Sequence, residues 1–127
     1  KVCNQIIVAL NIEAVAEALL SEMKIDAYFL EYDDDRSGDF RPLRFLPKDK
    51  IVVLGVMSSK QPALESVDAL AARIDEASRF APLEQLAVSP QCGFASTYLG
   101  NPLTPEIQRQ KLALVVEVAT AVWGKLD

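Results

Sequence analysis

The sequence contains no histidine and only two cysteines in 127 residues. Histidine is the side chain that most often binds transition metals and moves protons near neutral pH, so any such chemistry must use other residue types here. Cys3 and Cys92 could form a disulfide in a secreted protein, but no signal-peptide pattern opens the sequence and we expect reduced thiols. Reduced thiols can serve as buried side chains, nucleophiles or metal ligands.

Long apolar runs and an excess of positive charge are also missing. The longest apolar stretches, such as "IIVAL" and "IVVLGVM", are far shorter than the roughly 20 residues that cross a bilayer. The 13 basic residues are outnumbered by 18 acidic ones, and the net charge of -5 leaves no basic stripe to neutralise nucleic-acid phosphates. We therefore expect a soluble, cytoplasmic protein that binds neither a membrane nor nucleic acid.

What the sequence does contain is the composition of an ordinary globular protein. Half of the residues are hydrophobic and 24% are charged, which argues against disorder. A chain of this length buries roughly two-thirds of the surface that its unfolded form exposes, enough for a core without a disulfide or a metal. We expect one domain over residues 1–127.

Strand-type and helix-type patterns alternate along the chain. Apolar runs typical of strands cover residues 4–10, 27–32, 51–57 and 86–88, and helical periodicity covers residues 12–23, 67–77 and 105–123. The last helix has the clearest limits, with Thr104 as N-cap, Pro105 in the first turn and Gly124 as the stop. The apolar faces predicted for the three helices are Ile12, Val15, Leu19 and Met23; Val67, Leu70, Ile74 and Ala77; and Leu112, Val115, Ala119 and Val122.

This alternation predicts an α/β fold with a mostly parallel sheet and helices packed over it. Four units are too few to close an eight-stranded barrel. A half-barrel would leave two sheet edges and one apolar sheet face uncovered. It would need a partner chain, a second copy of itself or the rest of a longer polypeptide.

Three residues that could bind a metal lie near strand ends: Cys3, Glu31 in "FLEY" and Cys92 in "SPQCGF". The carboxyl ends of parallel strands share one edge of the sheet, so residues that are distant in the chain can meet there. Two thiolates and a carboxylate suit Zn²⁺, and three protein ligands leave a position for a substrate thiol that the cation would deprotonate for alkyl transfer. Without a local ligand motif, a buried thiol and a solvated loop acid stay open as alternatives.

Four longer stretches carry a resemblance to a known family. They are "FLEYDDDRSGDFRPLRFLP", "VVLGVMSSK", "ARIDEASRFAPLEQLAVSPQCGFAST" and "KLALVVEVATAVWG". Together they resemble the C-terminal part of the cobalamin-independent methionine synthase family, in the branch of shorter single-barrel homologues, from about Ile12 to Gly124. The resemblance implies a single partial barrel domain over residues 1–127, about the C-terminal half of a TIM-type (β/α)8 barrel.

The same resemblance implies a zinc-dependent methyltransferase of methionine biosynthesis. In the family, zinc activates the thiol of homocysteine for methylation by a donor, classically a methylated folate. Carried over residue by residue, the zinc ligands are Cys3, Glu31 and Cys92. The family's histidine ligand falls on Lys1, a departure, because a lysine must lose its proton to bind zinc.

Residues around the expected metal have weaker assignments. Met57 stands where longer members carry a histidine proposed for proton movement, whereas Ser58–Lys60 fit the shorter branch. Lys60 is a candidate for contact with the substrate carboxylate, and Asp33 and Arg36 are candidates for substrate positioning. The plain alternative for Asp33 and Arg36 is a solvated acidic turn.

Two other functions remain open from the sequence. The chain could be a catalytically inactive truncated relative, or a subunit that completes a barrel with another chain. It could also be an acidic α/β binding module in which the two cysteines are incidental.

Overall fold

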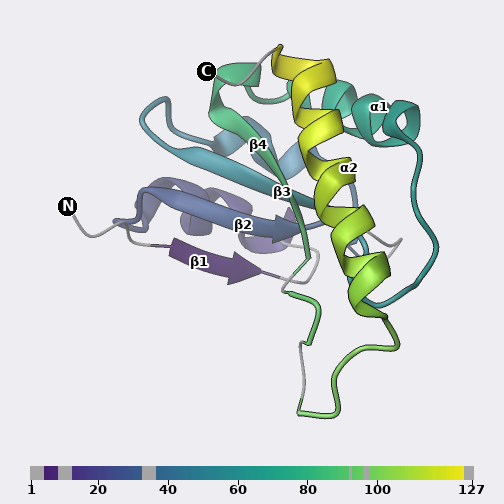
Figure 1. Cartoon of the computed structure of the whole chain (residues 1–127). Coiled ribbons are helices and arrows are strands. Elements are labelled where there is room, and N and C mark those ends of the chain that lie inside the picture. The colour runs from purple at the N-terminus through teal and green to yellow at the C-terminus, as the bar shows by residue number, and fades with distance from the viewer. Residues whose placement is uncertain (1–4, 9–12, 33–36, 92, 96–97, 125–127) are drawn as a thin grey trace.

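The computed structural model describes residues 5–8, 13–32, 37–91, 93–95 and 98–124, with the backbone alone for residues 5–8. Its centre is a sheet of four strands: β1 (Gln5–Val8), β2 (Ala27–Glu31), β3 (Ile51–Met57) and β4 (Leu86–Pro90). The strands pair in chain order and each is parallel to the next (Figure 1). Sequential parallel strands joined by helical connections are the repeat of a TIM-type barrel, so the predicted partial barrel is confirmed.

Two long helices connect and follow the later strands. They are α1 (Val67–Ser78) and α2 (Pro105–Trp123), and shorter helical turns are η1 (Glu13–Val15), η2 (Ala18–Glu22), η4 (Arg41–Phe45) and η5 (Leu83–Gln85). The hydroxyl of Thr104 accepts a hydrogen bond from the backbone N–H of Ile107, and α2 ends at Gly124 with φ of 85°, as predicted. Among the described residues, no helix is both long and apolar enough to cross a bilayer.

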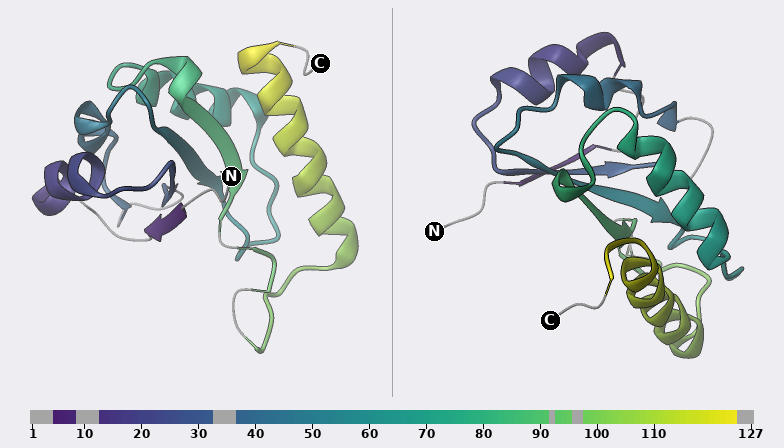
Figure 2. Two further views of the ribbon diagram at one scale, coloured as in Figure 1. Left: turned by 90° about the vertical axis from the view of Figure 1, so that its left-hand side faces the viewer. Right: turned by 90° about the horizontal axis from the view of Figure 1, so that it is seen from above.

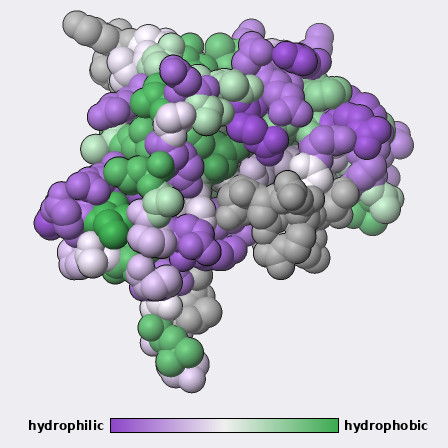
Figure 3. Space-filling view, turned by 90° about the vertical axis from the view of Figure 1, so that its right-hand side faces the viewer, coloured by the Kyte–Doolittle hydropathy of each residue, from purple (hydrophilic) through white to green (hydrophobic). Residues whose placement is uncertain are grey.

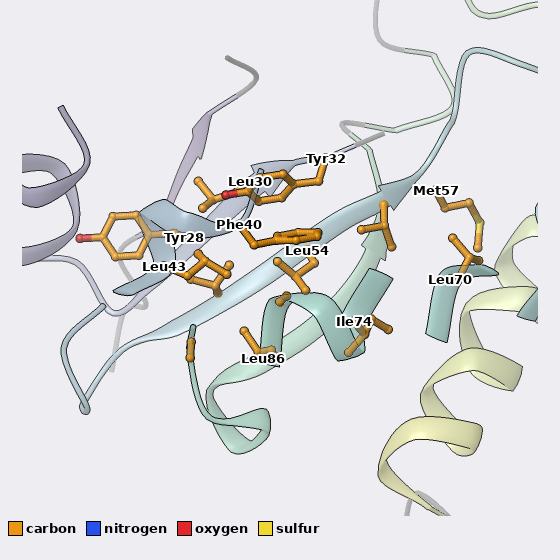
Figure 4. Close-up of a cluster of buried hydrophobic side chains, with 14 of the residues drawn as sticks. Tyr28, Leu30, Tyr32, Phe40, Leu43, Leu54, Met57, Leu70, Ile74 and Leu86 are labelled. Atoms are coloured by element: carbon orange, nitrogen blue, oxygen red, sulfur yellow. The ribbon is translucent and has the colours of Figure 1, made fainter. Parts of the chain in front are cut away.

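One face of the sheet carries the hydrophobic core. Seen from above, the helical segments follow one another around one side of the strands (Figure 2). Helix α1 packs against β3 and β4, and α2 packs against α1 and β4. Alternate residues of the strands point into this layer, and the labelled core residues are Tyr28, Leu30, Tyr32, Phe40, Leu43, Leu54, Met57, Leu70, Ile74 and Leu86 (Figure 4).

The other face of the sheet is less covered. Phe29 of β2 pairs in register with Val53 of β3, which pairs with Ala87 of β4, and all three are only partly buried. The next row on the same face is Glu31, Gly55 and Ser89. In a TIM-type barrel such rows point into the barrel interior, so this open face corresponds to the interior side.

The predicted apolar face of the first helical segment is wrong by about one residue. Ala16 and Leu20 are the buried residues, whereas the side chain of Val15 is 57% exposed. The segment begins with a 3₁₀ turn and ends with π-type turns, so the spacing departs from the 3.6 residues per turn on which the prediction depended. Ile12 lies outside the described residues.

The predicted face of the last helix is also displaced. Lys111, Leu114 and Val118 are buried in α2, and Leu112 is 45% exposed. The helix packs at the edge of the sheet and on α1, and a buried lysine occupies a position that the hydrophobic pattern assigned to the surface. The predicted face of α1 is confirmed, because Leu70, Ile74 and Ala77 are buried.

Candidate functional site

The site is built at the carboxyl ends of β2, β3 and β4. Glu31 is the last residue of β2 and its side chain is only 8% exposed, on the open face of the sheet. Its neighbour in register is Gly55, where an added Cβ would lie 3.3 Å from the carbonyl oxygen of Leu30. Glycine at this place lets β2 and β3 approach closely and leaves space beside the carboxylate.

The carboxylate of Glu31 is buried without full compensation. Its Oε2 lies 3.9 Å from Nζ of Lys60, a distance too long for a hydrogen bond. Its Oε1 has no hydrogen-bond partner among the described residues. A buried charge of this kind is costly unless a ligand or another group binds it, so Glu31 is suited to accept a cation or a proton donor.

Other unpartnered polar atoms gather at the same edge. In the described part of the chain, the buried side-chain nitrogen and oxygen atoms without a hydrogen bond belong to three residues: Glu31, Ser59 and Gln91. Ser59 follows β3 and is fully buried, and Gln91 follows β4 and is 7% exposed. Most buried polar groups in native proteins are satisfied, so three exceptions at one edge of one sheet indicate a place for a polar ligand.

A cavity of about 290 Å³ opens beside these residues on the uncovered face. Its walls include Phe29, Val53, Phe94 and Leu112, and Glu31 and Gln91 also line it. Mostly apolar walls with a few polar groups are typical of a small-molecule site. The side chain of Leu112 in α2, which is partly exposed, therefore forms part of the wall of this cavity.

The end of β2 is held firmly from the covered side. The ring of Tyr32 packs on Phe40 with centroids 4.4 Å apart, and Arg73 of α1 donates to the Tyr32 carbonyl at 3.1 Å. Burial, with a further contribution from the charge of Asp39, raises the pKa of Tyr32 well above its usual value. Because these contacts fix Tyr32, they also fix the backbone of the adjacent Glu31.

The loops after β3 and β4 are joined to each other. The side-chain amide of Asn101 donates to the carbonyl of Ser59 at 2.8 Å and to the carbonyl of Gly93 at 3.2 Å. Gly93 has φ of 107°, a conformation that favours glycine. Residues 98–100, which precede Asn101, project from the body (Figures 1 and 3), and Tyr98 and Leu99 are exposed.

Comparison with known proteins identifies the family. Residues 4–121 match the family model described as the cobalamin-independent synthase catalytic domain. The chain belongs to this family. The family resemblance read from the sequence is thereby confirmed.

Relatives within the family agree in sequence and in fold. The Bacillus subtilis (strain 168) proteins YxjH and YxjG, both named as uncharacterized, are 54% and 51% identical over 112 residues. A candidate vitamin-B12-independent methionine synthase from Listeria monocytogenes superposes with a TM-score of 0.76 at 37% identity, over 95% of this chain. A B12-independent methionine synthase from Shewanella sp. W3-18-1, whose structure is a complex with selenomethionine, gives a TM-score of 0.71 over 87% of this chain at 22% identity. At this identity the likeness shows the fold alone.

The chain spans only part of these proteins. It covers 30% of the length of YxjH and of YxjG, 35% of the Listeria protein and 30% of the Shewanella protein. The catalytic-domain match and the open sheet face agree with a portion of a cobalamin-independent synthase barrel.

The structure brings together only some of the residues predicted for the site. Glu31 and Lys60 lie beside each other. Met57 is fully buried in the core and does not line the cavity. The remaining predicted residues fall outside the described part of the chain, and they are Lys1, Cys3, Asp33, Arg36 and Cys92.

Sequence reasoning missed Gln91 and Asn101 as site residues. Gln91 stands inside the motif "SPQCG", between the end of β4 and Cys92, and this position was the available signal. No sequence pattern marks Asn101, because the two carbonyls to which its amide donates, those of Ser59 and Gly93, lie 42 and 8 residues away along the chain.

Among the described residues that line the cavity, Glu31 supplies the one carboxylate, a donor of the kind that zinc requires. No group of three or more acidic or cysteine side chains close enough to hold a metal occurs among the described residues. Cys3 and Cys92 fall outside the described part of the chain. The buried Oε1 of Glu31, which none of the described residues contacts by a hydrogen bond, fits the carboxylate donor of a zinc site in type and in burial. The structure leaves the thiolate donors as a prediction.

Proposed function

We propose that this chain forms the zinc-binding and thiol-binding side of a methyltransferase site of the cobalamin-independent methionine synthase type. The reaction would transfer a methyl group from a donor such as a methylated folate to a homocysteine-like thiol in methionine biosynthesis, in the cytoplasm. The observation that carries the proposal is the buried carboxylate oxygen of Glu31, which has no partner among the described residues and lies at the carboxyl edge of the sheet in a chain that belongs to this family.

The proposed zinc ligands are Cys3, Glu31 and Cys92, with Lys1 at the position where the family has histidine. When bound, zinc would lower the pKa of the acceptor thiol and so supply a thiolate nucleophile near neutral pH. Glu31 would contribute its carboxylate, and the backbone of Glu31 is already fixed by the contacts of the adjacent Tyr32. Pre-positioned ligands reduce the ordering cost of binding and orient sulfur toward the methyl carbon.

The other residues of the chain would bind and orient the substrate. The apolar cavity walls, including Phe29 and Phe94, exclude water from the thiol. Lys60 is 45% exposed and lies 3.9 Å from Glu31, so its ammonium group can pair with a substrate carboxylate beside the metal. Asp33 and Arg36, which follow β2 in the chain, are proposed to position the substrate.

The first test is zinc per chain, measured by elemental analysis of the reduced protein with and without homocysteine. We expect close to one zinc in the unmodified chain and loss of most of it in Glu31→Gln and in Cys92→Ser. The matched control is Glu84→Gln, which removes an exposed carboxylate from the opposite end of the sheet and should leave zinc unchanged. Absence of zinc from the unmodified chain, with or without the thiol, would contradict the proposal, as would full zinc in Glu31→Gln.

A second function is favoured by the open face of the sheet. Ile51 is 45% exposed, Phe29 and Val53 are partly buried on this face, and the chain spans 30% to 35% of its relatives. These facts support a role in completing a barrel with further polypeptide, with another chain or with a second copy of itself, with no catalysis by this chain. A chain that binds no zinc in the experiment above would favour this second function.

A further inference from the structure

Lys111 is a buried lysine on the apolar side of α2. Its side chain is 0% exposed, and its Nζ donates to Oε2 of Glu65 at 2.9 Å and to the carbonyl of Ala63 at 2.7 Å. Burying an ammonium group is costly even when it is paired, and an apolar residue of similar size would fill the same space. Stability alone therefore gives a weak reason for a lysine here.

The partners of Lys111 belong to the segment that connects β3 to α1. Residues 58–65 form neither helix nor strand, and in Figure 1 this segment runs beside α2 before it reaches α1. The second oxygen of Glu65, Oε1, accepts from the backbone N–H of Ser58 at 2.8 Å. Lys111 and Glu65 thus join the two ends of the segment to each other and to α2.

The segment carries residues of the candidate site. Lys60 lies within it, 3.9 Å from Glu31, and the buried hydroxyl of Ser59 has no partner among the described residues. Asn101 holds the Ser59 carbonyl from the other side. Lys60 is part of this segment, so a displaced segment would carry the base of its four-carbon stem, and with it the reach of the ammonium group, away from Glu31.

We propose that Lys111 is a positioning residue for the site: through Glu65 and the carbonyl of Ala63 it fixes segment 58–65 so that Lys60 stays beside Glu31. This inference rests on the proposed function only in taking the edge around Glu31 as the site. It needs neither bound zinc nor turnover. Lys111 itself touches no ligand and acts through the segment.

The test follows the environment of the Lys60 ammonium group directly. Lysines are converted to dimethyl-lysines with ¹³C-formaldehyde and cyanoborohydride as the reductant, which keeps their charge, and the Lys60 signal is identified by its loss in Lys60→Arg. When Lys111 is kept, we expect the Glu31→Gln substitution to shift the Lys60 signal, because the Glu31 carboxylate is the neighbour of the Lys60 ammonium group. In Lys111→Met we expect the Lys60 signal to move to the position of fully exposed lysines and the shift on adding Glu31→Gln to be lost.

The matched control is Arg109→Met. It removes an exposed positive charge from the same helix, and this charge pairs with Glu106 within the helix. It should leave the Lys60 signal and its response to Glu31→Gln unchanged. If Lys111→Met does not fold, the double variant Lys111→Met/Glu65→Leu removes both charges and carries the test, with the same loss expected.

Two results would overturn the inference. One is a Lys60 signal that responds to Glu31→Gln as strongly in Lys111→Met as in the unmodified chain. The other is an unmodified chain in which Glu31→Gln has no effect on Lys60. Zinc content is a separate measurement, so a chain without zinc can still confirm the positioning role, and a zinc-binding chain can still contradict it.

Discussion

Gln85 and Gln91 stand at opposite ends of β4 and are buried to almost the same extent, 8% and 7% exposed. At the amino end, Nε2 of Gln85 donates to the carbonyls of Pro47 and Lys50 at 2.7 Å and 2.6 Å. At the carboxyl end, neither amide atom of Gln91 has a partner among the described residues. The same side chain with the same burial is therefore satisfied at one end of the strand and unsatisfied at the other.

The charged residues show the same contrast. Lys50 at the amino end is 8% exposed, and its ammonium group donates to the carbonyls of Leu20 and Met23 and to the hydroxyl of Tyr28. Glu31 at the carboxyl end is equally buried, but one of its oxygens has no partner in the described part of the chain. In parallel α/β barrels the amino end contributes stability and the carboxyl end carries the chemistry, and the hydrogen bonds of this chain divide in that way.

The largest expected effect is at the satisfied end. Gln85→Leu keeps the volume but removes both hydrogen bonds and leaves the Lys50 carbonyl without this donor. We expect a loss of about 2 kcal/mol in the free energy of unfolding, because unmade buried hydrogen bonds are costly. Urea unfolding followed by circular dichroism measures it, and a loss close to zero would show that the amino end is not held by these bonds.

The next prediction separates the two faces at the carboxyl end. Tyr32 adjoins Glu31 but packs on the covered side, and burial raises the pKa of its phenol above the ordinary value. The unfolded chain therefore releases this proton first, so the contribution to stability is complete below a pH of about 10 and is lost as pH rises. Between pH 9 and pH 11 the unmodified chain should lose about 1.4 kcal/mol more than Tyr32→Phe does.

Urea unfolding of both chains at the two pH values provides this comparison, and Tyr32→Phe cancels the contributions of all other groups. Equal losses in the two chains would mean that the phenol ionises freely and that the covered side is open at this end. A greater loss in the unmodified chain would confirm that the phenol of Tyr32 is buried and that the covered side is packed at this end.

The fold could be predicted from local patterns where packing follows sequence directly. The strand predicted over residues 51–57 is β3 with the same bounds, because a continuous apolar run fits a buried parallel strand. The start of α2 was also predictable, since Thr104 caps it as expected. The approach of Lys60 to Glu31 agrees with the rule that residues after parallel strands share one edge.

Other features could not be predicted because they depend on contacts between distant segments. Lys111 is a surface residue by type, and its burial depends on Glu65, which lies 46 residues away. The face of the first helical segment depends on π-type turns that hydrophobic periodicity does not contain. The metal-ligand roles of Cys3 and Cys92 remain predictions.

The smallest expected effect is at the unsatisfied end and is not a loss of stability. Gln91→Leu removes an amide that has no partner among the described residues and places an apolar group beside Phe29 and Phe94 in the cavity wall. We expect the free energy of unfolding to stay the same or to rise by up to about 1 kcal/mol. Gln85→Leu is the matched control, since it makes the same substitution at almost equal burial, and of the two variants Gln85→Leu alone should lower the free energy of unfolding. A loss in Gln91→Leu as large as in Gln85→Leu would mean that the chain itself satisfies this amide, and the carboxyl edge would then lose one of its three reasons to be considered a ligand site.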